Sequence, residues 1–188
     1  MTEELIQKFP IPKTGYRQLF EQISKELPQR GALSFSAAVS ANLRRLDPET
    51  EFATPDLVRV LVRAGVATGD LRNNERARAW ATVGQSLALM AHAGLRSGPR
   101  IGTALRDIAL SDNRLARLLT ARGAALREQA VRTVRRIASA GKPASLDDLL
   151  ELLLVDTLAG SDEWAESLRL RIVESFERAT PKADASTG

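Results

Sequence analysis

The sequence predicts an all-α protein of about eight helices arranged as two small helical bundles. Every clear hydrophobic period along the 188 residues is helical, and no stretch alternates apolar and polar residues as a half-buried strand does. With 44% hydrophobic residues, the chain can also bury a core in one domain or two small ones. These observations together favour helical bundles over any sheet-containing fold.

Four helices are predicted in the first half of the chain. The apolar stripe that begins at Tyr16 repeats at i, i+3, i+4, i+7 and i+11 and stops before Pro28. Asp47-Pro48 ends the second helix, and Thr54-Pro55-Asp56 is typical of an N-cap, a first-turn proline and a first-turn acid. The predicted spans are residues 16–27, 39–46, 54–65 and 74–92, the last with Trp80, Val83, Leu87 and Met90 inward.

The second half contains the remaining helices, at 101–108, 112–123, 124–140, 146–158 and 161–176. Ser111 is a predicted N-cap, and Ser145 with Asp148 resembles a capping box. In the helix at 146–158, leucines surround all but an acidic sector, so we expect it to be buried on most sides or covered by a partner, with the acidic sector exposed. That sector is Asp147, Asp148 and Glu151.

The loop at residues 96–100, which contains Gly98 and Pro99, is the predicted boundary between the two bundles. It divides the chain into an N-terminal helical subdomain at residues 1–97 and a C-terminal helical subdomain at 98–180. The polar residues 181–188 are predicted to form a disordered tail.

Charge is concentrated in one segment. Residues 96–142 contain ten arginines and one lysine against three acids, a net charge of +8, whereas the residues before sum to +2 and those after to −6. A basic face beside an acidic one suggests a phosphate backbone as partner. In the helix at 124–140, Leu126, Ala130, Val134 and Ile137 share one face, and Arg132, Arg135 and Arg136 lie opposite.

The composition excludes several classes of site. The chain has no cysteine and one histidine, His92, so it has no thiolate nucleophile, disulfide framework or histidine pair for a metal. It has no glycine-rich phosphate loop, and no apolar run approaches the roughly 20 residues of a membrane span. We therefore expect a cytoplasmic protein that is not an enzyme and needs no cofactor, metal or membrane.

Five segments, taken in order, resemble one known family. They are NLRRLDP at 42–48, PDLVRVL at 55–61, IGTAL at 101–105, NRLARLL at 113–119 and VRRI at 134–137. In this order they resemble the small subunit (CasB family) of the type I-E CRISPR Cascade. The resemblance implies a non-enzymatic, all-helical protein present in two copies in a crRNA-guided complex, where it helps hold the displaced DNA strand of the R-loop. Its implied partners are crRNA, target DNA, other Cascade subunits and a second copy of itself.

Ten cations are the candidate nucleic-acid-binding residues: Arg44, Arg45, Arg106, Arg114, Arg117, Arg122, Arg132, Arg135, Arg136 and Lys142. Each has a simpler explanation. The helix-borne arginines could form an ordinary solvated face, Arg117 could pair with an acid of the next helix, and Arg44 and Arg45 could bind the carbonyls at a helix end. The alternative function is a helical protein–protein adaptor that meets its partner through the segment at 146–158 and does not bind nucleic acid.

Overall fold

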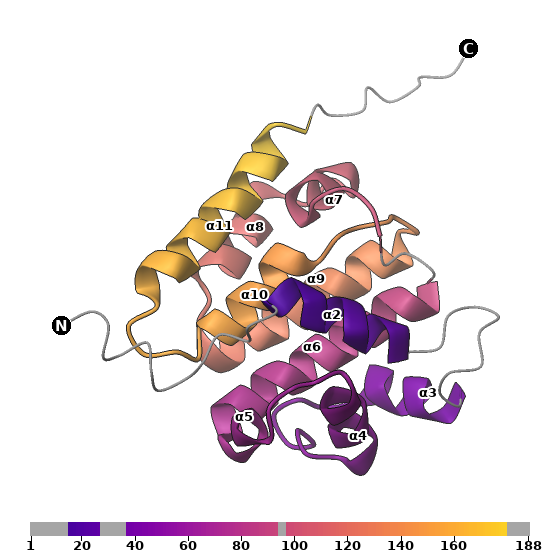
Figure 1. The fold of residues 1–188 in the computed structure, drawn as a ribbon. Helices are drawn as coiled ribbons and strands as arrows, with labels where there is room; N and C mark the ends of the chain where they lie inside the picture. The colour runs from indigo at the N-terminus through magenta and orange to yellow at the C-terminus, as the bar shows by residue number, and fades with distance from the viewer. Residues whose placement is uncertain (1–14, 27–36, 94–96, 180–188) are drawn as a thin grey trace.

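The computed structural model describes residues 15–26, 37–93 and 97–179. This part of the chain contains ten helices and no strand, with one isolated bridge between Arg100 and Ser145, so the all-α prediction is confirmed (Figure 1). The helices are α2 Gly15–Glu26, α3 Ala37–Arg45, α4 Pro55–Arg63, α5 Thr68–Arg72, α6 Asn74–Ala93, α7 Ile101–Asp107, α8 Asp112–Thr120, α9 Gly123–Ser139, α10 Asp147–Val155 and α11 Asp162–Glu177.

All nine predicted segments correspond to a helix, but a tenth helix was not predicted and one predicted cap is wrong. The five-residue helix α5 was not predicted because it buries no residue and so has no apolar stripe. The Ser145–Asp148 capping box does not form. Leu146 occupies the N-cap position of α10, and the Ser145 backbone N–H instead donates to the Pro99 carbonyl at 2.8 Å.

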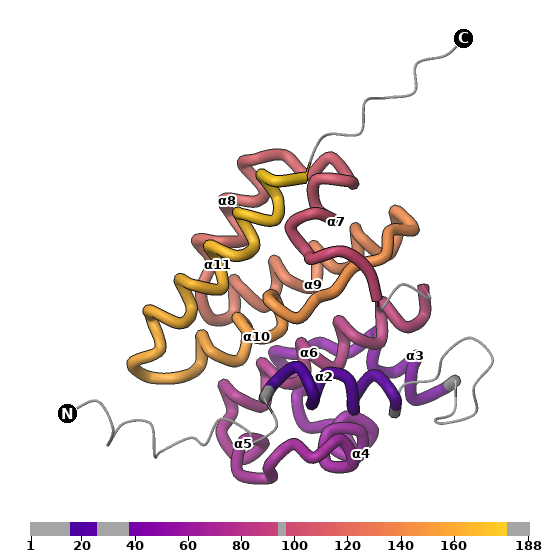
Figure 2. The backbone as a smooth tube through the Cα atoms, turned by 45° about the horizontal axis from the view of Figure 1, so that its top comes forward, coloured from indigo at the N-terminus to yellow at the C-terminus, as the bar shows by residue number. Residues whose placement is uncertain are grey.

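The long helix α6 lies at the centre of the fold, with α2, α3, α4, α5, α9 and α10 packed around it (Figures 1 and 2). Its side chains are buried on almost every side, including Trp80, Val83, Leu87 and Met90, as predicted. Its most extensive partner is α9, which buries Leu126, Ala130, Val134 and Ile137. This packing turns the opposite face of α9 towards solvent.

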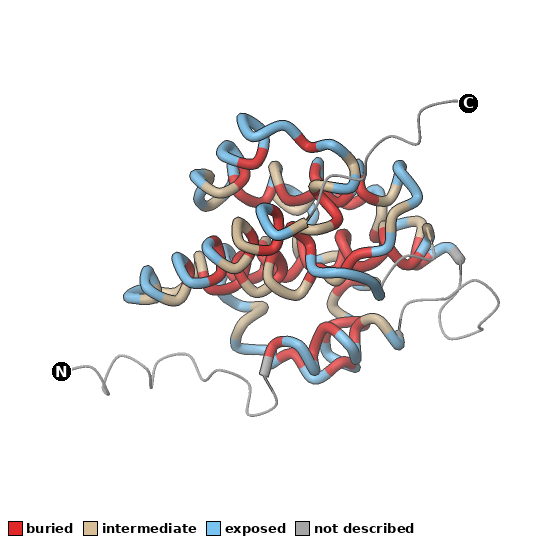
Figure 3. Tube along the Cα trace, turned by 90° about the horizontal axis from the view of Figure 1, so that it is seen from above, coloured by how far each residue is buried: buried red, intermediate tan, exposed pale blue. Residues whose placement is uncertain are grey.

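One hydrophobic cluster includes buried side chains from both sides of residue 97, since α6 and α9 share it. Figure 3 shows the result: buried residues line the inner faces of the helices and exposed residues their outer faces. The division into subdomains 1–97 and 98–180 stays a prediction, and the predicted tail at 181–188 lies outside the described residues. None of the described helices has the length and apolar character needed to cross a membrane.

The leucine-rich helix α10 was expected to be either buried on most sides or covered by a partner, and the structure shows the first arrangement. Leu149, Leu150, Leu152, Leu153 and Leu154 are at most 1% exposed, under cover from α2, α6, α7, α9 and α11.

The exposed acidic sector predicted on α10 is wrong, because neighbouring helices cover it. Asp147 pairs with Arg17 of α2 and Asp148 pairs with Arg171 of α11. The indole N–H of Trp164 donates to Glu151 at 3.0 Å. All three acids are half-buried.

Candidate nucleic-acid interface

Two helices of the basic segment, α8 and α9, form a groove of about 490 Å³ between them. Five arginines line it, two from α8 and three from α9, together with three uncharged residues. The arginines are Arg114, Arg117, Arg132, Arg135 and Arg136, and the uncharged residues are Leu110, Gln129 and Thr133. Among the described residues that line this groove, none is acidic.

The apolar pattern of each helix explains why these arginines point outward. Leu115 and Leu118 are the buried residues of α8, which leaves Arg114 and Arg117, three residues apart, on its exposed face. On α9 the buried stripe lies opposite the other three arginines, all of which are exposed. Packing of two amphipathic helices therefore places two rows of guanidinium groups along one groove.

Four of the five groove arginines have no ion-pair partner among the described residues, which leaves their guanidinium groups available to an anion. Arg132 forms an ion pair with Glu128, one turn earlier on α9. Within the described part of the chain, Arg114, Arg117, Arg135 and Arg136 form no ion pair. Guanidinium groups with no internal partner can form charge-assisted, bidentate hydrogen bonds with phosphate oxygens.

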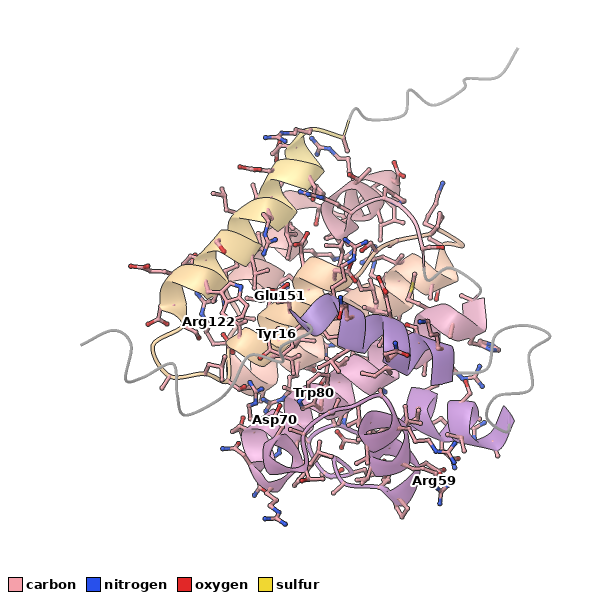
Figure 4. All side chains as sticks on the ribbon, in the orientation of Figure 1. Tyr16, Arg59, Asp70, Trp80, Arg122 and Glu151 are labelled. Atoms are coloured by element: carbon pink, nitrogen blue, oxygen red, sulfur yellow. The ribbon has the colours of Figure 1, made fainter. Side chains whose placement is uncertain are left out.

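Two other predicted cations have internal partners. Arg106 is half-buried, pairs with Glu177 and lies over the ring of Phe176, 4.4 Å from the ring centre. Arg122, which is labelled in Figure 4, donates to the carbonyls of Leu119 and Ala121, and pairs with Glu166 of α11. Both guanidinium groups contact acids in the folded chain, unlike the four free groove arginines.

The remaining predicted cations lie outside the groove. Arg45, exposed at the end of α3, borders a second depression of about 430 Å³ that also contains Glu51 and Asp56. Arg44, next to Arg45 in the sequence, is half-buried, and Lys142 is half-buried just after α9. The structure thus brings together five of the ten predicted residues.

Sequence reasoning missed two groove residues, Gln129 and Thr133, and a signal in the sequence could have found the first. Gln129 lies three residues before Arg132 and shares the face of α9 that carries the arginines, whereas Thr133 is 7% exposed and belongs to the buried side of the helix. Gln129 adds an amide, which can also donate hydrogen bonds to phosphate.

In the part of the chain that the structure describes, the aromatic residues gather in the core and not in the groove. Trp80 is fully buried, with the rings of Tyr16 and Phe20 6.3 and 6.4 Å away. Figure 4 shows Tyr16 and Trp80 in the middle of the molecule, with Asp70, which accepts the Trp80 indole N–H at 3.2 Å. No aromatic side chain is among the described residues that line the groove. The groove therefore offers side chains suited to phosphate and sugar, and no ring among its described lining on which a base could stack.

Comparison with known families decides the class of protein. Residues 39–176 match the family model of the CRISPR-associated protein Cse2. The chain belongs to this family. The match confirms the resemblance to the CasB-type small subunit of Cascade and covers both helices of the groove. No curated protein and no solved structure matches the chain. Within the described residues, no group of three or more acids or histidines is arranged to hold a metal ion.

Proposed function

We propose that this Cse2-family chain is a non-catalytic, nucleic-acid-binding subunit of a cytoplasmic type I-E Cascade, and that it stabilises the R-loop. Its partners are crRNA, the displaced strand of target DNA, other Cascade subunits and a second copy of itself. The observation that carries this proposal is the groove between α8 and α9, lined by five arginines and no acid among the described residues. Family membership supports the role in Cascade.

The chemistry of such a site is electrostatic. Each arginine that neutralises a phosphate releases condensed counterions, which gives affinity without reading sequence. Exchange of a DNA strand for crRNA is nearly balanced in free energy, so small contributions from backbone contacts decide how far the R-loop extends. A groove that holds the displaced strand delays reannealing and shifts this balance towards the R-loop.

The adaptor alternative depended on the segment at 146–158 as a surface for a protein partner. The leucines of α10 are buried against the chain's own helices, and its acids contact Arg17, Arg171 and Trp164. This segment therefore offers neither an apolar face nor a free acidic sector to a partner, and no observation favours the alternative.

The decisive experiment replaces Arg132, Arg135 and Arg136 together with alanine and reconstitutes the complex. Alanine preserves the helix, and the buried face of α9 is unchanged, so assembly should be normal. We expect R-loop formation to fall, and the slope of log affinity against log salt for strand binding to drop by about 2 to 3 if all three reach phosphates.

A matched control removes three cations elsewhere. Arg59, Arg72 and Arg178 are exposed and do not line the groove, so their replacement with alanine changes the net charge equally. Arg59 lies on α4, at the opposite end of the molecule in Figure 4 from Arg122 at the start of α9. If the two triple variants form R-loops equally well, the groove is not the binding surface.

A further inference from the structure

The two walls of the groove meet at a turn of only two residues, because α8 ends at Thr120 and α9 begins at Gly123. Among the described helices, α9 is the one on which α8 packs most extensively. The orientation of α8, and with it the position of Arg114 and Arg117, therefore depends strongly on how this turn is held.

The side of the turn where α8 ends is fixed by a residue of α11. The side chain of Arg169 is 6% exposed, and its Nε donates to the carbonyl of Leu119 at 2.9 Å. Figures 1 and 2 both show α8 and α11 side by side. A buried guanidinium at the C-terminal end of a helix donates to a carbonyl that has no partner within the helix. Its positive charge is also stabilised by the helix dipole.

The side of the turn that begins α9 is held by Asp156, the residue that caps the C-terminal end of α10. The side chain of Asp156, 8% exposed, accepts the backbone N–H of Gly123 at 2.7 Å. Gly123 has φ +52°, a left-handed conformation that other residues rarely adopt. A carboxylate at a helix N-terminus is favoured by the helix dipole and satisfies a free N–H.

The two holding residues also bind each other, since Arg169 Nη2 lies 3.2 Å from Asp156 Oδ1. The end of α8, Arg169, Asp156 and the start of α9 therefore form one continuous chain of hydrogen bonds. Arg122, in the turn itself, pairs with Glu166, and Glu166 also pairs with Arg169 at 3.1 Å.

We infer that Arg169 and Asp156 are positioning residues for the groove, which fix the arginine row of α8 relative to the row of α9. This inference rests on the proposed function, because positioning matters only if both rows contact the same strand. Loss of either residue frees the turn, so α8 no longer holds Arg114 and Arg117 where they reach phosphates of a strand bound along α9.

The test is a double-mutant cycle on single-stranded DNA binding by the full chain. In the parent protein, replacing Arg114 and Arg117 with alanine should lower the salt slope by about 1.4, the value for two contacts to a single strand. In an Asp156→Ala background the same replacement should produce no further drop, because the α8 row has already lost its position. Replacing Arg135 and Arg136 should have its full effect in both backgrounds.

Asp148→Ala is the matched control, since it also removes a carboxylate that pairs with an arginine of α11, but from the first turn of α10 and away from the turn between α8 and α9. In this background the Arg114 and Arg117 effect should equal that in the parent. Asp156→Asn keeps an acceptor for the Gly123 N–H but loses the negative charge, so it should give a weaker form of the same non-additivity. It replaces Asp156→Ala if the alanine variant does not fold.

A second readout measures position directly. The chain has no cysteine, so spin labels at Ser111→Cys and Ser139→Cys, both exposed, report the distance between the far ends of α8 and α9. We expect this distance distribution to broaden in the Asp156 variants and not in Asp148→Ala.

The two ideas fail differently. If replacing Arg114 and Arg117 does not change strand binding in the parent, the proposed role of the groove is wrong. If it weakens binding equally in the parent and Asp156 backgrounds, or if the labels keep one narrow distance, the positioning role is wrong and the groove remains.

Discussion

Arg127 of α9 donates a 2.9 Å hydrogen bond to the carboxylate of Glu75 on α6, across 52 residues of sequence. A second guanidinium nitrogen donates to Glu49 at 3.0 Å, and the arginine side chain is only 4% exposed. Arg127 belongs to the same basic segment and the same helix as the groove arginines. One helix therefore uses arginine in two ways, inward to join distant parts of the chain and outward to present charge.

Arg127→Ala should destabilise the protein by about 1 to 3 kcal/mol. Removal of one partner from a buried ion pair costs more than this, but Glu49 and Glu75 are partly exposed and can be hydrated. Urea unfolding measures the loss. Arg132→Ala, an exposed change on the same helix, is the control and should alter stability by less than about 0.5 kcal/mol. Equal stability of the two variants would contradict the internal role of Arg127.

Two glutamates should affect stability with opposite dependence on pH. Burial raises the pKa of Glu151 above its usual value, and the nearby charge of Arg171 and the hydrogen bond from Trp164 do not cancel this effect. Burial also acts to raise the pKa of Glu75, but hydrogen bonds from Arg127 and Arg78 outweigh it and leave the pKa lowered. The folded state therefore favours the protonated form of Glu151 and the ionised form of Glu75.

For Glu151, stability is highest below the pKa of the unfolded state and falls as pH rises towards the folded-state pKa. For Glu75, stability is present above the unfolded-state pKa and falls as pH drops through the folded-state pKa. Relative to the parent, Glu151→Gln should thus become more stable as pH rises from acid to neutral, and Glu75→Gln less stable. Unfolding free energies measured across this range check both signs, and parallel curves for the two variants would refute the assignment.

The sequence was sufficient to predict features that depend on local periodicity. The buried stripe of α9 and its outward arginines follow from residue spacing on one helix, and so do the buried leucines of α10. The burial of Arg127 could also have been predicted from the sequence, because at 100° per residue Arg127 lies only about 20° from the buried Val134. The partners of Arg127 could not be predicted in this way, since Glu49 and Glu75 come from segments far away in sequence.

Long-range contacts account for the other differences. The acids of α10 were expected in solvent because their helix was considered alone, whereas α2 and α11 supply Arg17, Arg171 and Trp164 to cover them. The turn between α8 and α9 is likewise held by Arg169 and Asp156, which follow it in sequence by more than 30 residues. No periodicity of α8 or α9 predicts these contacts.

Leu150→Asp and Leu153→Asp should each cost more than about 4 kcal/mol, because they place an unpaired charge among side chains that are at most 1% exposed. Leu170→Asp makes the same chemical change at a position 57% exposed on α11 and should alter stability by less than about 0.5 kcal/mol. Thermal or urea unfolding of the three variants compares them directly. If all three unfold like the parent protein, α10 is not part of the core.

Strand binding should depend on phosphates and not on bases. The described lining of the groove offers guanidinium groups, an amide, a hydroxyl and the apolar Leu110, but no ring on which a base can stack. Stacking on an aromatic side chain contributes about 1 to 3 kcal/mol per base to the binding free energy. The presence or absence of stacking should therefore be clear from the affinity for strands that lack some of their bases. We expect a strand with several abasic sites to bind within about twofold of the intact strand, since its phosphates are unchanged.

The matched ligand is a strand of the same sequence in which methylphosphonates replace several phosphates, because it keeps every base and loses charge. Its affinity should fall, and its salt slope should decrease by about 0.7 for each phosphate lost from the contact surface. Fluorescence anisotropy titrations at several salt concentrations measure both quantities. A tenfold loss on removing bases corresponds to about 1.4 kcal/mol, within the range of a stacked base, and would show that an aromatic surface outside the groove contributes to binding.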